Sequence, residues 1–307
     1  MSHDHHGHAH GQPAATADFG RAFAIGIGLN LAYVIAEAGY GLAAGSLALL
    51  ADAGHNLGDV LGLGLSWGAA MLGRRGPSTR FTYGFRSSTI LAALANALIL
   101  LVVTGGIAWE ALWRLSHPVA VAGGLVALVA AIGIAVNGAT ALLFARGRGA
   151  DLNIRSAFAH MAADALIALG VVAAGVAIMS TGWHWLDPAV GLVVSATIVY
   201  GTWDLVRQAL SLALDAVPQG VDADAVRAHL LAQPGVAALH DLHIWGMSTT
   251  ETALTCHLVM PGGHPGDAAL SRVAHELEHR FGIHHATIQI EIGDSDAVCA
   301  LTPEHVV

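Results

Sequence analysis

The chain has 307 residues, of which 55% are hydrophobic and only 11% are charged. Ordinary soluble domains contain about 25% charged residues, so this composition predicts an integral membrane protein that lies in a lipid bilayer. The formal net charge of −9, with all 13 basic residues being arginine, gives no indication of a nucleic-acid partner. Two cysteines, Cys256 and Cys299, are too few for a disulfide framework and suit a reducing cytosolic location.

Residues 1–18 form a polar segment rich in histidine, which predicts a disordered tail. The segment lacks the Arg-rich start and the short apolar core of a cleavable signal peptide. Two interpretations stay open for it. The tail is either a solvated extension without a specific role, or a loose arm that collects metal ions, because neutral imidazole binds zinc and nickel.

Six apolar stretches follow the tail, and each reaches the roughly 20 residues that a membrane-spanning helix needs. Arginines occur in the connections after the second and the fourth stretch, whereas the other connections contain none. Because arginine-rich loops stay on the cytoplasmic side, both chain termini are predicted to be cytoplasmic. The predicted spans are residues 21–43, 46–72, 87–115, 119–145, 152–179 and 187–210.

Two of these spans contain a His-x-x-x-Asp pair, His55 with Asp59 and His160 with Asp164. A spacing of four places both side chains of a pair on the same helix face. A charged Asp at the centre of a spanning helix costs roughly 2.5–3.5 kcal/mol, so the repeated pair favours a functional role over helix packing or a buried water. Two imidazoles and two carboxylates are suited to a tetrahedral zinc site.

The chemistry of these four residues predicts an exchange of metal for protons. His and Asp bind a metal only when deprotonated, so metal binding releases protons and proton binding releases metal. Histidine suits this exchange because its ordinary pKa of about 6.5 is close to cytosolic pH. Imidazole also disfavours the hard cations Mg²⁺ and Ca²⁺. Nearby, Asp52 is expected to support His55 or to lie on an access path, and Glu37 is expected to line the cavity.

After the last span, the pattern predicts a small soluble domain. Its order is an amphipathic helix, two alternating strands, a second amphipathic helix and a third strand, which is typical of a compact two-layer α+β domain. The predicted elements are residues 221–233, 236–246, 251–260, 267–281 and 286–292.

The second of these helices contains HELEH at 275–279, which matches the zinc metalloprotease signature H-E-x-x-H. The apolar face of the helix points His275, Glu276 and His279 toward solvent, whereas a protease needs these residues in a walled cleft. We therefore interpret the match as a coincidence and predict that the protein is not an enzyme.

Several motifs resemble the cation diffusion facilitator family. They are LLADAGHNLGDV in the second span, RFTYGFR after it, NIRSAFAHMAADAL in the fifth span, and LHDLHIW, TCHLVM and ATIQIE in the soluble domain. The resemblance implies a six-helix transmembrane domain, a ferredoxin-like cytoplasmic domain, a homodimer and export of divalent metal against protons. His-x-x-x-Asp on both spans resembles the zinc-transporting branch, which places the transport site at His55, Asp59, His160 and Asp164.

The resemblance also implies a second, regulatory zinc site in the cytoplasmic domain. Its ligands would be His240, His257 and Glu291, with His284 as the fourth. A polar sheet face with unconnected histidines is the other interpretation. A charge interlock at the membrane–domain junction, used in the family, implies that Arg80 or Arg86 pairs with Asp215.

The sequence thus predicts a proton-coupled exporter of Zn²⁺, with H⁺ as the counter-ion, in a bacterial cytoplasmic membrane. It has a tail at 1–18, a transmembrane domain at 19–212 and a cytoplasmic domain at 213–307. Two alternatives stay open. One is the same mechanism with broader specificity that includes Cd²⁺, Co²⁺ or Ni²⁺, and the other is a membrane zinc sensor that binds without turnover.

Overall fold

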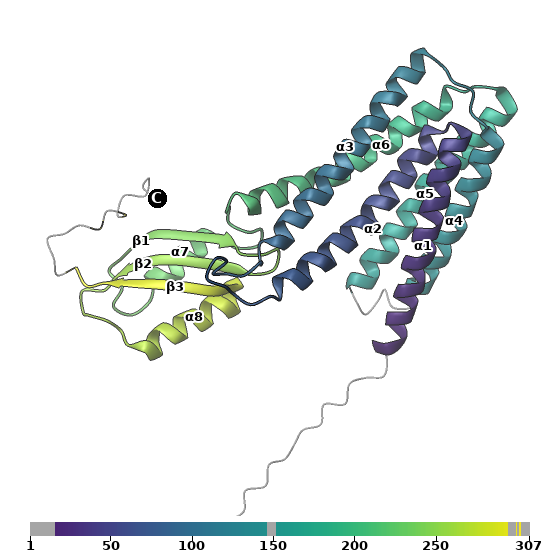
Figure 1. Cartoon of the computed structure of the whole chain (residues 1–307). Coiled ribbons are helices and arrows are strands. Elements are labelled where there is room, and N and C mark those ends of the chain that lie inside the picture. Colours follow the sequence, from purple (N-terminus) through teal and green to yellow (C-terminus); the bar gives the residue numbers. More distant parts are fainter. Residues whose placement is uncertain (1–15, 146–151, 294–298, 300, 302–307) are drawn as a thin grey trace, which may run out of the picture. The chain divides into compact units, whose positions relative to one another are not determined.

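We analysed a computed structural model of the chain, which describes residues 16–145, 152–293, 299 and 301 (Figure 1). Six long helices precede the small α+β domain, as the apolar stretches predict. Within the described residues, four helical segments are long and apolar enough to cross a membrane, at Ser88–Ser116, Gly123–Leu142, Met161–Thr181 and Leu186–Ala213. The six helices are α1 (Thr16–Ala44), α2 (Leu47–Gly73), α3 (Ser88–Ser116), α4 (Gly123–Ala145), α5 (Leu152–Thr181) and α6 (Leu186–Ala213).

The chain divides into two compact units, one of residues up to 60 with 102–198 and one of 61–101 with 199–307. In the first unit, α4 packs against both α1 and α5. The contact with α5 is close because Gly175 has no side chain: a Cβ there would lie 2.7 Å from the backbone nitrogen of Ala127. Glycine at this point therefore allows the two backbones to approach, as small residues do between membrane helices.

A buried carboxylate of α6 holds the start of α2. Asp187, which is fully buried, accepts hydrogen bonds from the Ser46 hydroxyl and from the backbone N–H groups of Leu47 (2.6 Å) and Ala48 (3.4 Å). The first N–H groups of a helix have no partner within the helix and carry a partial positive charge. Asp187 supplies both the missing acceptor and a compensating negative charge, so it fixes the helix that carries His55 and Asp59.

We expect Asp187→Ala to destabilise the protein by about 2–3 kcal/mol, because it leaves buried donors at the start of α2 without an acceptor. In detergent this loss should lower the midpoint of thermal unfolding by about 5 °C or more. The matched control is Asp204→Ala on the same helix, since Asp204 is 74% exposed and lies 3.9 Å from Arg207. Equal midpoints for the two variants would contradict this role of Asp187.

The second unit contains the α+β domain, in the order α7 (Ala223–Leu231), β1 (Ala238–Gly246), β2 (Thr252–Val259), α8 (Asp267–Phe281) and β3 (Ile283–Glu291). The sheet order is β1-β2-β3, with β2 antiparallel to β1 and parallel to β3. Both helices pack on one face of this three-stranded sheet, where Leu230 and Leu277 meet Leu254 and Leu258. Two layers around one apolar core are the arrangement that the sequence predicts.

The third strand begins earlier than predicted. Gly282 ends α8 in the left-handed conformation, with φ 68°, so the chain reverses within one residue and β3 starts at Ile283. The prediction began only at residue 286, where the alternation of polar and apolar residues becomes regular.

A bulge interrupts β1 between His240 and His243. At this bulge Asp241 has a positive φ of 51°, and the register shifts so that His240 pairs with His257 while His243 pairs with Thr255. Residues paired across antiparallel strands share a face, and residues 255 and 257 are two apart. The bulge therefore brings His240 and His243 to the same face of the sheet, although a regular strand would separate them.

Candidate metal sites

Three of the four predicted transport ligands lie together in the first unit. His55 on α2 lies between two carboxylates, with its Nε2 3.9 Å from Asp59 Oδ2 and 3.5 Å from Asp164 Oδ1 on α5. The fourth predicted ligand, His160, lies on α5 one turn before Asp164, and its side chain is outside what the structure describes. The arrangement thus joins two helices through an imidazole and two carboxylates.

The burial of these side chains is uneven. The side chain of Asp164 is 1% exposed, that of His55 18% and that of Asp59 37%. A buried carboxylate needs a compensating partner, and His55 supplies one in this structure. A divalent cation bound by the three side chains would compensate the Asp164 carboxylate more strongly than His55 does. The cluster is open to solvent at Asp59, which is the most exposed of the three.

Further buried polar residues lie close to this group. The Tyr33 hydroxyl donates a 2.6 Å hydrogen bond to Glu37 Oε1 on α1. Asp52 of α2 is buried and interacts with Glu37, with His55 and with Asp164. Asp52 is thus close enough to His55 to act on its charge, and Glu37, which the sequence led us to expect along the cavity, is fully buried.

A second cluster lies on the α+β domain of the second unit. His240, His257, Glu291 and Cys299 place one ligand atom each within 4.8 Å of one another. Glu291 Oε1 is 2.9 Å from His257 Nδ1 and 3.3 Å from His240 Nε2, and Cys299 Sγ is 3.7 Å from His257 Nδ1. Two imidazoles, a carboxylate and a thiol are ligands that zinc accepts in a tetrahedral site. Within the described residues, these four are the only such group of three or more.

The structure does not bring His284 into this cluster. His284 is the second residue of β3, whereas Glu291 is the last, so about 23 Å of extended strand separates them. His284 lines a different pocket of about 540 Å³ together with Glu251 and Phe281. Cys299 occupies the fourth position instead, and we did not predict it.

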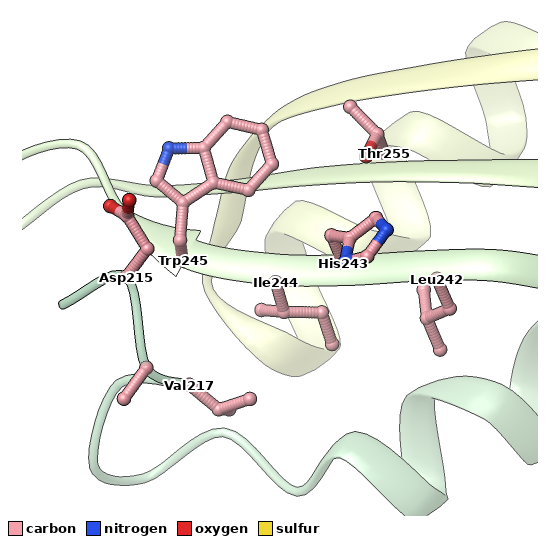
Figure 2. A pocket seen from close by; sticks show the side chains of 8 residues that line it. Asp215, Val217, Leu242, His243, Ile244, Trp245 and Thr255 are labelled. Carbon is pink, nitrogen blue, oxygen red and sulfur yellow. The ribbon is translucent and has the colours of Figure 1, made fainter. Parts of the chain in front are cut away.

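Asp241 connects the cluster to His243. Its carboxylate lies 3.4 Å from His257 Nε2 and 2.9 Å from His243 Nε2. A carboxylate on the far nitrogen of a histidine fixes the ring and its tautomer, and metal-binding histidines commonly have such a partner. Asp241 therefore leaves His257 Nδ1 directed at Glu291. His243, which we did not predict as a ligand, lines a pocket of about 500 Å³ with Trp245, Thr255 and Asp215 (Figure 2).

The arginine expected to pair with Asp215 has another partner. Arg86 Nη1 lies 2.5 Å from Glu251 Oε1, at the turn between β1 and β2. Two hydrogen bonds reinforce this contact: the Ser87 hydroxyl donates to Met247 O and the Thr249 N–H donates to Thr89 Oγ1. The Arg80 guanidinium lies over the Phe81 ring, 5.7 Å from its centroid. The start of α3 is thus attached to the β1–β2 turn.

The HELEH residues of α8 lie largely on its outer face. His275 and His279 are exposed, as predicted, and their rings contact each other with centroids 4.1 Å apart. Glu276 is partly buried because its carboxylate contacts His229 Nε2 of α7 at 3.0 Å and accepts a hydrogen bond from Gln233. Glu276 thus links α8 to α7.

Comparison with known families agrees with these observations. Residues 23–212 match the model for the cation efflux transmembrane domain, and residues 218–292 match the model for the cytoplasmic domain of cation efflux proteins. The chain therefore belongs to the cation efflux family, which is the cation diffusion facilitator family that the motifs resemble.

Among its relatives is the metal cation efflux system protein CzcD of Cupriavidus metallidurans, which is 33% identical over 93% of this chain and 90% of that protein. The zinc transporter ZitB of Escherichia coli is 33% identical over 93% of this chain and 92% of that protein. The cadmium, cobalt and zinc/H(+)-K(+) antiporter of Bacillus subtilis is 32% identical over 84% of this chain and 85% of that protein. A solved structure, the metal-bound C-terminal domain of the CzcD transporter, is 39% identical over 23% of this chain and 99% of that chain, with a TM-score of 0.22.

Proposed function

We propose that this protein exports Zn²⁺ from the cytosol in exchange for protons. The observation that carries the proposal is the convergence of His55, Asp59 and Asp164 from two different helices. His160 is the fourth ligand in this proposal, because it lies one turn before Asp164 on α5. The names of the relatives support zinc as cargo, and one name supports antiport.

The exchange follows from the chemistry of the ligands. Zn²⁺ binds to deprotonated imidazole and carboxylate, so protons that reach these groups compete with the metal. Alternating access lets the same group face each side of the membrane in turn. A proton gradient directed inward then favours metal binding on the cytosolic side and metal release on the opposite side.

The topology of this proposal has six membrane spans, with α1 and α2 added to the four segments that are apolar enough within the described residues. The transmembrane domain is 19–212 and the ferredoxin-like cytoplasmic domain is 213–307, with both termini in the cytosol of a bacterium. Two copies form a homodimer. The match of residues 218–292 to the cytoplasmic domain of the family supports this orientation.

The cytoplasmic cluster is proposed as a regulatory zinc site. Its ligands are His240, His257, Glu291 and, in place of His284, Cys299, whose ligand atoms lie close enough for one ion to reach. Metal at this site would hold the end of β3 and Cys299 against β1 and β2.

Transport by purified protein in liposomes tests the main proposal. With a zinc indicator inside the vesicles and an imposed pH gradient, Zn²⁺ should accumulate, and accumulation should stop when the gradient is abolished. Saturable binding without flux would instead show a sensor. Faster flux of Cd²⁺, Co²⁺ or Ni²⁺ than of Zn²⁺ would show broader specificity, which the name of the Bacillus subtilis relative favours.

A further inference from the structure

A pair of buried carboxyls lies next to the membrane metal site and is not part of it. Glu37 of α1 is 0% exposed and Asp52 of α2 is 1% exposed. Tyr33 lies one turn before Glu37, between the two carboxyls and α4. A Cβ at Gly133 of α4 would lie 2.2 Å from the Tyr33 hydroxyl, so the ring is packed directly on that helix. Solvent therefore has no direct contact with either carboxyl.

The hydrogen bonds of this pair are incomplete unless one carboxyl is protonated. Glu37 Oε1 accepts from Tyr33, but Glu37 Oε2 and Asp52 Oδ1 have no hydrogen-bond partner among the described residues. The Asp52 carboxyl and the Asn56 amide of α2 both lie close to the Glu37 carboxyl. Two carboxylates are acceptors only, whereas a protonated carboxyl donates to its neighbour. One proton on Glu37 would supply a donor between the two carboxyls.

The charges around the pair also favour a proton there. On α1 the titratable neighbour is Tyr33, on α2 it is His55, one turn from Asp52, and on α5 it is Asp164. The α4 helix contributes no ionisable residue between 123 and 142. Among the described side chains, the carboxyls of Glu37, Asp52 and Asp164 thus lie near one group that can become cationic, His55, and like charges in a buried site disfavour full ionisation.

Asp52 links Glu37 with the metal site electrostatically, since Glu37, His55 and Asp164 all lie close enough to act on its charge. A divalent cation bound by His55 and Asp164 would attract negative charge on Asp52 and Glu37, which favours loss of the proton. When the cation leaves, the repulsion between carboxylates favours its return. Glu37 is therefore coupled to the metal without touching it.

We propose that Glu37 is a proton-carrying residue outside the set of metal ligands. Its carboxyl gives up one proton to solvent when metal binds and takes one proton from solvent when metal leaves. The inference rests on the proposed function, because it assigns part of the proton exchange to a residue that is not a ligand. It predicts that the number of protons released per metal exceeds what the ligands alone release.

Calorimetric titration of the purified full-length protein with Zn²⁺, in buffers of different ionisation enthalpy, measures the protons released per metal bound. Glu37→Gln should release about one proton fewer, and it should bind zinc about 10-fold more weakly, because a neutral amide cannot supply the negative charge that the bound metal favours. Glu37→Asp keeps the carboxyl and should restore the release. Glu110→Gln is the matched control, because Glu110 is a partly exposed carboxyl of α3 paired with Arg114 at 2.9 Å. Release of the full number of protons by Glu37→Gln would overturn the inference.

Infrared spectroscopy of the wild-type protein tests the same inference without relying on any variant to fold. The infrared difference spectrum on addition of zinc should show loss of a protonated-carboxyl band, and absence of that loss would also overturn the inference. Transport separates this inference from the proposed function. If the wild type moves no zinc, the proposed function fails. If it moves zinc while Glu37→Gln releases all its protons, only the role of Glu37 fails.

Discussion

Asp164→Asn is expected to abolish zinc transport and to weaken zinc binding by more than about 100-fold. Losing a residue that only supports a ligand already costs about 10–100-fold in metal affinity, and Asp164 is proposed as a ligand itself. Its side chain is 1% exposed and lies 3.5 Å from His55, so no water-exposed group can easily replace it. Flux into liposomes that contain a zinc indicator, together with calorimetric binding, measures both effects.

Asp204→Asn is the control for this experiment, since Asp204 lies on a membrane helix and is 74% exposed. It should transport zinc at the wild-type rate. Asp59→Ala and His55→Ala should behave like Asp164→Asn. Transport at the wild-type rate by any of these three variants would remove that residue from the proposed site.

Zinc is expected to protect Cys299 from alkylation, while Cys256 stays unmodified whether or not zinc is present. Burial, with a contribution from the nearby Asp241 carboxylate, raises the pKa of the Cys256 thiol to about 12. Below that pH the thiol keeps its proton, and only the thiolate reacts. Cys299 is partly exposed and lies 3.7 Å from His257. A saturating zinc concentration should slow its alkylation by more than about 10-fold, because a thiolate bound to metal is a poor nucleophile.

Mass spectrometry of the two cysteine-containing peptides measures this protection at neutral pH. His257→Ala should abolish it, whereas His284→Ala should retain it, because His284 lies at the opposite end of β3. Equal alkylation rates with and without zinc would contradict a metal site at Cys299. If His284→Ala rather than His257→Ala abolished the protection of Cys299 by zinc, His284 would be a ligand, as the sequence implied.

The order of elements was accessible from the sequence because it depends on local patterns. The second apolar stretch, predicted at 46–72, is observed as α2 at Leu47–Gly73, since a local run of helix-forming, mostly apolar residues sets its ends. The spacing of four between His55 and Asp59 guarantees a shared helix face. Membership of the cation efflux family, which the motifs indicated, is confirmed by the matches over both parts of the chain.

The metal-binding cluster of the α+β domain was harder to predict because it depends on irregular backbone. Nothing in the sequence marks the positive φ of Asp241, so the bulge that aligns His240 with His243 could not be foreseen. Cys299 follows the last strand, where periodicity gives no information about the path of the chain. The pairing of Arg86 with Glu251 likewise joins exposed residues far apart in the sequence, for which no local pattern exists.

The contact between Asp187 and the first residues of α2 restricts how the transporter can change shape. Separating the two helices at this point would leave a carboxylate, a hydroxyl and two N–H groups buried without hydrogen-bond partners, so the beginnings of α2 and α6 should move together as a rigid pair. The proposed metal ligands of α2, His55 and Asp59, would then change position relative to α5 rather than relative to α6. A covalent cross-link between the starts of α2 and α6 should leave the cycle intact, whereas one between α2 and α5 should arrest it.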